Sequence, residues 1–196
     1  MAETPRAAMI FAAGLGTRMG ALTRDRPKPL IPVAGRPLLD HALALVRGVG
    51  VPRVVVNTHA HAAQVADHLA RSAPDVLVSH EPERLETGGG LKRALPLLGS
   101  GPVFTLNADM VWSGPNPLAA LAAAWRPGMG ALLVVVPREN AVVRSEEGHR
   151  ASAASASAMP SGRPTSTQPP WWTRPKSRPA AISLSHTGLR ENTGSS

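Results

Sequence analysis

Short apolar runs alternate with segments of helical periodicity along residues 7–136. The apolar runs predict buried strands over residues 7–13, 53–57, 75–79, 103–107 and 131–136. The periodic segments predict helices over residues 37–48, 60–72, 89–98 and 117–125. Apolar strands that alternate with amphipathic helices indicate a mainly parallel sheet covered by helices on both faces, an α/β architecture of the Rossmann-like type.

One edge of this predicted sheet gathers the residues that could carry chemistry. The segment 14–32, too rich in Gly, Pro and charge for a regular element, follows the first strand, whereas Asn57 and Asp109 come at or just after the ends of two others. Ligands of open parallel sheets bind beyond the carboxyl ends of the strands. We therefore expect the glycine-rich segment, Asn57 and Asp109 to meet at one ligand site.

The pattern changes abruptly near residue 143. Residues 151–158 consist of alanine and serine alone, and residues 160–179 include six prolines. Such composition predicts a basic, low-complexity, disordered tail over residues 143–196, after an incomplete domain over residues 1–142. The abruptness of the change favours a translated frameshift or a gene-model error as the origin of this tail.

Composition narrows the compartment and the partners. The chain of 196 residues has no cysteine, which excludes disulfides and thiolate metal sites, and its net charge is +8. We expect no nucleic-acid binding, because no basic stripe with interleaved aromatic residues occurs. No apolar run approaches the roughly 20 residues of a membrane helix, and the apolar run 7–15 has no clean cleavage site. These features predict a cytoplasmic protein with an anionic small substrate.

A glycine turn after the first strand is the first candidate site. Gly14 and Gly16 allow positive φ angles and a close approach of ligand to backbone N–H groups. Thr17 adds a hydroxyl donor, and Arg18 adds a planar cation for phosphate oxygens. The segment is neither a Walker loop nor a dinucleotide fingerprint, because the required lysine and third glycine are missing. A phosphate site is the favoured interpretation, and an ordinary turn is the alternative.

Lys28 and Asp109 are the candidate charged groups. Lys28 lies between two prolines, and Pro29 is expected to hold it in an extended conformation, suited to contact with a phosphoryl group. Asp109 follows a buried strand, and its carboxylate could bind Mg²⁺, which takes few protein carboxylates and completes its shell with water and phosphate. The alternatives are an exposed loop lysine and a turn aspartate.

A second glycine cluster, at residues 88–90, opens a predicted helix. Its backbone could face a base or ribose, or it could form only a loop and a helix start. Glu81 and Glu83, just before this cluster, are expected at the surface. The histidines at 59, 61 and 68 do not form a metal set, and no arrangement of residues indicates covalent catalysis.

Together these segments resemble the sugar-1-phosphate nucleotidyltransferases. The matching segments, in chain order, are residues 11–19 (FAAGLGTRM), 26–30 (RPKPL), 32–38 (PVAGRPL), 55–59 (VVNTH), 85–91 (LETGGGL) and 106–109 (LNAD). Segments 86–90 and 107–112 are most similar to the N-acetylmuramate-1-phosphate uridylyltransferase branch, and mannose-1-phosphate guanylyltransferases are close behind. The resemblance implies the nucleotidyltransferase fold and an enzyme of cell-wall NDP-sugar biosynthesis.

The resemblance also implies a reaction and residue roles. A sugar 1-phosphate attacks the α-phosphorus of a nucleoside triphosphate, and pyrophosphate leaves. The resemblance favours UTP as this triphosphate. The implied catalytic residues are Arg18, Lys28 and Asp109, with Asp109 as the ligand of Mg²⁺. The implied nucleotide-binding residues are Ala13, Gly14, Gly16, Thr17, Asn57 and Gly88.

The C-terminal segment departs from the family pattern. Members of the family continue into sugar-binding strands and a second metal-binding aspartate, but residues 143–196 contain no aspartate. We therefore expect poor folding or weak nucleotide binding. A catalytically impaired nucleotide-binding or regulatory module remains an alternative to the enzyme, and a nucleic-acid-associated protein with a basic tail is a third.

Overall fold

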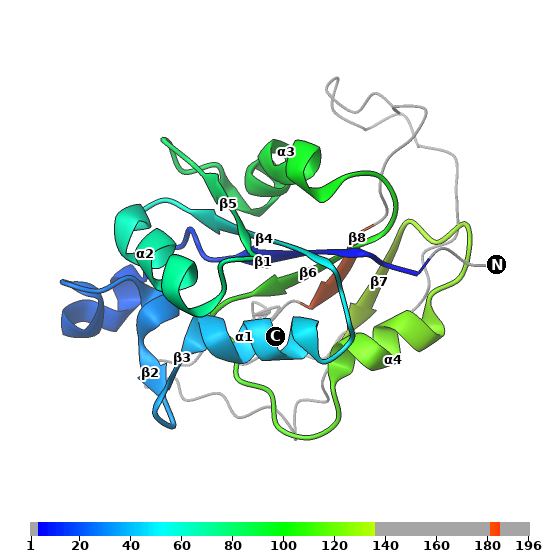
Figure 1. Ribbon diagram of the computed structural model, residues 1–196, viewed down its shortest axis with the longest axis horizontal. Coiled ribbons are helices and arrows are strands. Elements are labelled where there is room, and N and C mark those ends of the chain that lie inside the picture. Colours follow the sequence, from blue (N-terminus) through cyan, green and yellow to red (C-terminus); the bar gives the residue numbers. More distant parts are fainter. Residues whose placement is uncertain (1–3, 136–180, 185–196) are drawn as a thin grey trace, which may run out of the picture.

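One six-stranded parallel sheet forms the centre of the molecule. The structure is a computed structural model that describes residues 4–135 and 181–184. The sheet strands are β1 (Ala7–Phe11), β4 (Arg53–Thr58), β5 (Leu77–His80), β6 (Val103–Asn107), β7 (Ala131–Val134) and β8 (Ala181–Leu184). They are hydrogen-bonded in the order β5-β4-β1-β6-β8-β7, and every pair is parallel (Figure 1). The predicted parallel sheet is confirmed.

Helices cover both faces of the sheet. They are α1 (Leu38–Arg47), α2 (Ala62–Ser72), α3 (Glu86–Leu98) and α4 (Pro117–Ala124). In Figure 1, α3 lies on one face, and α1 and α4 lie on the other; the buried residues of α2 belong to the same hydrophobic cluster as buried residues of α1 and α4. The neighbours Met9 and Ile10 of β1 are both fully buried, and they belong to the separate hydrophobic clusters of the two faces. Side chains of a strand alternate between faces, so β1 contributes to both halves of the core.

The register of the central strands aligns their carboxyl ends. Phe11, the last residue of β1, is paired with Asn57 of β4 on one side and with Asn107 of β6 on the other. The three strands therefore end together, and the segments that follow them begin at one edge of the sheet.

Residues 12–37 contain short elements that the sequence pattern does not predict. They are the 3-10 helices η1 (Thr17–Thr23) and η2 (Lys28–Leu30) and a small hairpin of β2 (Pro32–Val33) and β3 (Arg36–Pro37). Ala34 and Gly35 turn the hairpin with φ angles of 50° and 75°. Positive φ at both turn residues suits the twist of a two-residue hairpin. Gly35 was the local signal of this turn, whereas Ala34 adopts a φ that is uncommon for alanine.

The expectation of an extended Lys28 is wrong. Lys28 begins η2, in which the amide of Leu30 bonds the carbonyl of Pro27 at 2.9 Å and the amide of Ile31 bonds that of Lys28 at 3.1 Å. Pro29 occupies an early helical position, where a missing N–H leaves no bond unmade. A 3-10 turn rather than an extended strand therefore presents the lysine.

Strand β8 comes from the segment predicted to be disordered. It lies between β6 and β7, and Ala181 is paired with Val103 on one side and with Ala131 on the other. The structure gives the backbone groups of residues 181–184 hydrogen-bond partners on both sides, within a segment whose composition predicts disorder. The predictions for residues 143–180 and 185–196, and for residue 136 of the predicted fifth strand, lie outside the described residues.

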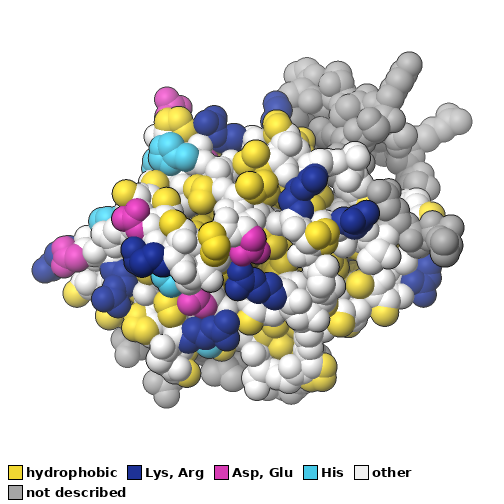
Figure 2. Space-filling model, in the orientation of Figure 1, with side chains coloured by type: hydrophobic (Ala, Val, Ile, Leu, Met, Phe, Trp, Pro, Cys, Tyr) yellow, Lys and Arg dark blue, Asp and Glu magenta, His cyan; other side chains and the backbone are white. Residues whose placement is uncertain are grey.

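Basic and acidic side chains are interspersed on the face of the molecule shown in Figure 2. Arg47 and Asp75 form an exposed ion pair, with 2.8 Å between nitrogen and oxygen. Within residues 4–135 and 181–184, no helix combines the length and the apolar character needed to cross a membrane.

Candidate active site

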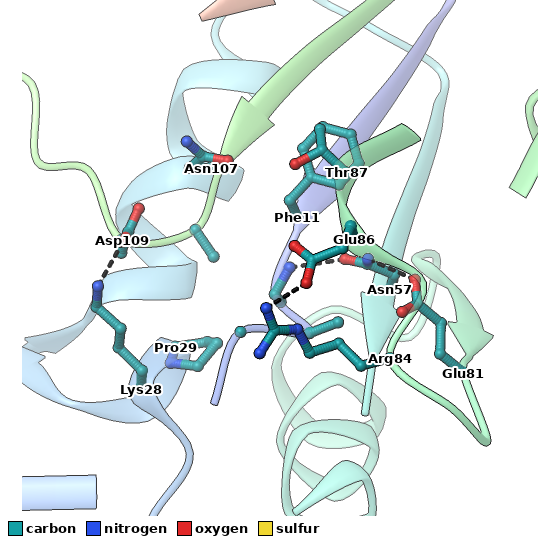
Figure 3. A pocket seen from close by; sticks show the side chains of 14 residues that line it. Phe11, Lys28, Pro29, Asn57, Glu81, Arg84, Glu86, Thr87, Asn107 and Asp109 are labelled. Carbon is teal, nitrogen blue, oxygen red and sulfur yellow. Dashed lines mark hydrogen bonds and ion pairs between the residues drawn. The ribbon is translucent and has the colours of Figure 1, made fainter. Parts of the chain in front are cut away.

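A cavity of about 220 Å³ opens at the carboxyl ends of β1, β4 and β6. Its walls come from the segments that follow these strands and from η2, the loop after β5 and the start of α3 (Figure 3). The lining residues are Phe11, Ala12, Ala13, Gly14, Lys28, Pro29, Asn57, Glu81, Arg84, Glu86, Thr87, Asn107, Ala108 and Asp109. The predicted meeting of the glycine segment, Asn57 and Asp109 at one edge is confirmed.

The candidate residues divide into two groups by position. Five line the cavity: Ala13, Gly14, Lys28, Asn57 and Asp109. Gly16, Thr17 and Gly88 are described residues outside the lining, with Gly16 and Thr17 at the start of η1 and Gly88 in the first turn of α3. Arg18 belongs to η1, but its side chain lies outside what the structure describes. The catalytic and binding roles of all nine residues stay predictions.

The two loop glycines serve different purposes. Gly16 has a φ angle of 65°, and a Cβ there would lie 2.9 Å from Thr23 Cγ2 and 3.1 Å from Lys28 Cβ. Gly14 has no positive φ, so that part of the expectation is wrong, and no atom lies within 4 Å of the position of a Cβ. Gly16 is therefore required by the fold of the loop, whereas Gly14 leaves open space at the cavity wall.

Lys28 and Asp109 form an ion pair on one side of the cavity. Lys28 Nζ donates to Asp109 Oδ2 at 2.5 Å, and the side chains are 29% and 39% exposed. Residues 81 positions apart meet because η2 and the segment after β6 both lie at the carboxyl edge. The contact joins the two charges that the sequence singles out. An accessible pair of this kind contributes roughly 0–1 kcal/mol to stability, so ligands can separate it at little cost.

A buried polar pair, Asn57 and Glu81, lies on the other side of the cavity (Figure 3). Asn57 Oδ1 accepts from the amide of Ala12 at 2.7 Å, and Asn57 Nδ2 donates to Glu81 Oε1 at 2.7 Å. Glu81 Oε2 accepts from the amide of Leu85 at 3.3 Å. Glu81 is only 1% exposed, so the expectation of a surface residue is wrong. Its position one residue after β5, at the same edge as Asn57, was the signal that could have found it.

Arg84, Glu86 and Thr87 form the wall of the cavity nearest α3. Arg84 and Glu86 form an exposed ion pair. Glu86 has a φ angle of 55°, which is uncommon for a residue other than glycine. The charged groups described at the cavity are thus three carboxylates, of Glu81, Glu86 and Asp109, and two cations, of Lys28 and Arg84.

The cavity provides no closed metal cage. Within the described part of the chain, no group of three or more His, Cys, Asp or Glu side chains could hold a metal ion. The donor set at Asp109 is a single accessible carboxylate beside a cavity. This donor set fits Mg²⁺, which binds through one or two carboxylates and takes its other ligands from water and phosphate.

Solved structures with a similar fold are nucleotidyltransferases. The UDP-glucose pyrophosphorylase from Acinetobacter baumanii has a TM-score of 0.57 and 18% identity over 68% of this chain and 57% of its own. The inositol-1-phosphate CTP transferase from T. maritima has the same score and identity and is covered to 55%. At this low identity the likeness shows the fold alone, a parallel α/β sheet that this chain shares with the two proteins.

Curated relatives narrow the class further. The N-acetylmuramate alpha-1-phosphate uridylyltransferase of Caulobacter vibrioides is 50% identical over 135 residues, which are 65% of this chain and 56% of the relative. The protein of the same name from Neisseria meningitidis is 43% identical over 53% of this chain and 47% of its own. The bifunctional protein GlmU of Paracidovorax citrulli is 40% identical over 71% of this chain and 30% of its own. The chain spans about half the length of the two uridylyltransferases.

A family model described as the MobA-like NTP transferase domain matches residues 8–192. The chain belongs to this family of MobA-like NTP transferases. The resemblance carried by the sequence motifs is thereby confirmed. The match includes most of the segment 143–196 that composition sets apart from the domain.

Proposed function

We propose that this chain transfers a nucleotidyl group from a nucleoside triphosphate to a sugar 1-phosphate. The favoured donor is UTP, and the favoured acceptor is N-acetylmuramate 1-phosphate. The products are an NDP-sugar and pyrophosphate. The observation that carries the proposal is the Lys28–Asp109 pair at the mouth of a cavity on the carboxyl edge. The 50% identity to the N-acetylmuramate alpha-1-phosphate uridylyltransferase of Caulobacter vibrioides supports the choice of UTP and of this sugar.

The residues divide the task by their chemistry. Ala13, Gly14, Gly16, Thr17 and Arg18 would hold the triphosphate with backbone and side-chain donors, and Lys28 would neutralise charge at the α-phosphate. Asn57 and the backbone at Gly88 would bind the nucleoside part. Phosphoryl chemistry of this kind depends on positioning and charge neutralisation more than on covalent catalysis.

Mg²⁺ is the proposed cofactor, and Asp109 is its proposed protein ligand. The described lining residues include three carboxylates and two cations. They therefore provide no surplus of positive charge for a triphosphate. A bound Mg²⁺ would supply that charge at the phosphate oxygens. Lys28 would then leave Asp109 and bind the nucleotide, while Asp109 turns to the metal.

Pyrophosphate release by the full chain tests the proposal. The assay contains UTP, N-acetylmuramate 1-phosphate and Mg²⁺, and parallel assays contain GTP with mannose 1-phosphate. Turnover that requires both substrates and Mg²⁺ supports nucleotidyl transfer, and the preferred pair identifies base and sugar. If no combination of substrates released pyrophosphate, the proposed nucleotidyltransferase activity would be refuted.

A nucleotide-binding module without turnover is the second candidate. The lack of aspartate in residues 143–196, where the resemblance implies a second metal-binding aspartate, favours it. Titration of the full chain with UTP and Mg²⁺ by calorimetry separates the two functions. Binding without pyrophosphate release identifies the module, and binding with release identifies the transferase.

A further inference from the structure

Glu81 is a carboxylate withdrawn from water at the edge of a ligand cavity. It is 1% exposed and lines the cavity next to Asn57. Burial of a carboxylate is costly unless hydrogen-bond donors replace the lost water. The identity of those donors therefore indicates what the carboxylate does.

Each oxygen of Glu81 accepts from a different part of the cavity wall. Oε1 accepts from Asn57 Nδ2 at 2.7 Å, and Oε2 accepts from the amide of Leu85 at 3.3 Å. Asn57 in turn accepts from the amide of Ala12 at 2.7 Å. Since Ala12 N–H can only donate, the Asn57 oxygen must face β1 and its NH₂ must face Glu81. One carboxylate thus connects the ends of β1 and β4 with the residue before α3.

Gly90 leaves the space that this pair requires. A Cβ at Gly90 would lie 2.5 Å from Glu81 Oε1 and 2.9 Å from Asn57 Nδ2. Gly90 is itself buried in α3, so the helix packs directly against the hydrogen bond. Even the smallest side chain would push the two groups toward the cavity or apart.

We propose that Glu81 is a positioning residue that holds Asn57 and the start of α3 in place before nucleotide binds. It acts through the Asn57 amide and the Leu85 amide. The wall of the cavity formed by Asn57, Glu86 and Thr87 is then preformed, and binding costs less ordering. The inference rests on the proposed nucleotide-binding function.

The variant Glu81→Gln tests the need for two acceptor oxygens. Glutamine keeps the size, but its single oxygen can serve either Asn57 or Leu85, and its NH₂ must face the other donor. We expect the dissociation constant of UTP with Mg²⁺ to rise about tenfold, with the KM for UTP rising more than kcat falls. Calorimetry and initial rates measure both, and circular dichroism confirms folding. Glu83→Gln, an exposed acid two residues away, is the matched control.

Gly90→Ala provides a second, independent variant, because it removes no polar group. It displaces the pair by contact and should weaken UTP binding by a similar factor. Its control is Gly130→Ala, at an exposed glycine with open space around the position of a Cβ. This variant keeps the test valid if Glu81→Gln does not fold.

The double variant Glu81→Gln with Asn57→Asp reverses the polarity of the pair. The carboxylate introduced at position 57 would accept from the Ala12 amide and from the NH₂ group introduced at position 81. The remaining side-chain oxygen at position 81 would accept from the Leu85 amide. Every donor then has a partner, so we expect the double variant to regain UTP affinity relative to either single variant. If the double variant recovers UTP affinity, the hydrogen bond between positions 57 and 81 is the cause of the loss in the single variants.

Three outcomes would overturn the inference. Glu81→Gln and Gly90→Ala could bind UTP as tightly as the unchanged chain, even if they unfold at lower temperature, which would give Glu81 a structural role only. The losses of the two single substitutions at 57 and 81 could simply add in the double variant. The unchanged chain could fail to bind UTP, GTP or any other nucleoside triphosphate, and this result alone would refute the proposed function as well.

Discussion

The two sides of the cavity hold their charges in opposite ways. Asn57 and Glu81 are 3% and 1% exposed, and each polar atom that faces the interior has a partner of fixed geometry. The side chains of Lys28 and Asp109 are 29% and 39% exposed and bind only one another among the described side-chain contacts. The buried side determines the shape of the cavity, and the exposed side keeps its charges available for exchange.

This contrast separates effects on stability from effects on reactivity. A buried hydrogen-bonded charge that loses its partner remains buried without compensation, which is unfavourable. An accessible ion pair contributes roughly 0–1 kcal/mol to stability, and its groups can exchange their partner for water. Substitutions on the buried side should therefore alter unfolding first, and substitutions on the exposed side should alter turnover first.

Asp109→Asn should have the largest effect on activity and a small effect on stability. The amide cannot supply a charged metal ligand, and Lys28 loses only an exposed partner. We expect turnover to fall about 10²–10³-fold, as for the loss of one electrostatic group in a catalytic site. Pyrophosphate release measures turnover, and thermal unfolding should show a change below about 1 kcal/mol. Turnover within tenfold of the unchanged chain would contradict the role of Asp109.

Asn57→Asp should have the reverse profile. The substitution places a second carboxylate against buried Glu81 and removes the donor of a 2.7 Å hydrogen bond. We expect the free energy of unfolding to fall by about 3 kcal/mol, as for an uncompensated buried charge. Denaturation in urea measures this loss. A variant as stable as the unchanged chain would remove the distinction between the two sides.

Gly16→Ala should affect both properties to a middle degree. Its Cβ would meet Thr23 Cγ2 at 2.9 Å and Lys28 Cβ at 3.1 Å, and alanine disfavours a φ of 65°. We expect a loss of about 1–3 kcal/mol in stability and a weaker interaction of Lys28 with nucleotide. Gly14→Ala is the control for stability, because its Cβ would enter open space without a change of φ. An equal loss in both variants would argue against a steric cause at Gly16.

Arg47→Ala should have the smallest effect. Arg47 pairs with Asp75 at 2.8 Å, and both side chains are well exposed and absent from the cavity lining. We expect a change in the free energy of unfolding below about 0.5 kcal/mol and unchanged turnover. This variant calibrates what an exposed ion pair contributes without a ligand site. A loss above about 1 kcal/mol, the upper end for such pairs, would mean that the stability change expected of Asp109→Asn is also underestimated.

Much of the fold could be predicted from hydrophobic patterning. The strands around Val54–Val56 and Val103–Leu106 are apolar almost throughout because both of their faces are buried, and this leaves a clear signal in the sequence. Three of the four residues of β8 are apolar too, but they lie in a segment with many prolines and serines, which obscures this signal. Its four residues gain their structure by pairing with β6 and β7, which are distant in the chain. Local composition does not encode that pairing.

The candidate site could be predicted in part for a similar reason. Asn57 and Asp109 were identified because they lie at or after the ends of recognisable strands, and both line the cavity. Glu81 obeys the same rule after β5, but neighbouring charged residues suggest a solvated loop. Its burial depends on Asn57, Leu85 and Gly90, so only the folded arrangement reveals it.

The ion pair of Lys28 and Asp109 also has a consequence for competitors in the cell. A lysine whose charge is already balanced at 2.5 Å attracts a lone inorganic anion only weakly. Free phosphate or sulfate would have to displace the carboxylate without offering it a new partner. Under the proposed function, a nucleotide that arrived with its own divalent ion would satisfy both groups at once, so the resting site would discriminate against abundant small anions before any sugar was bound.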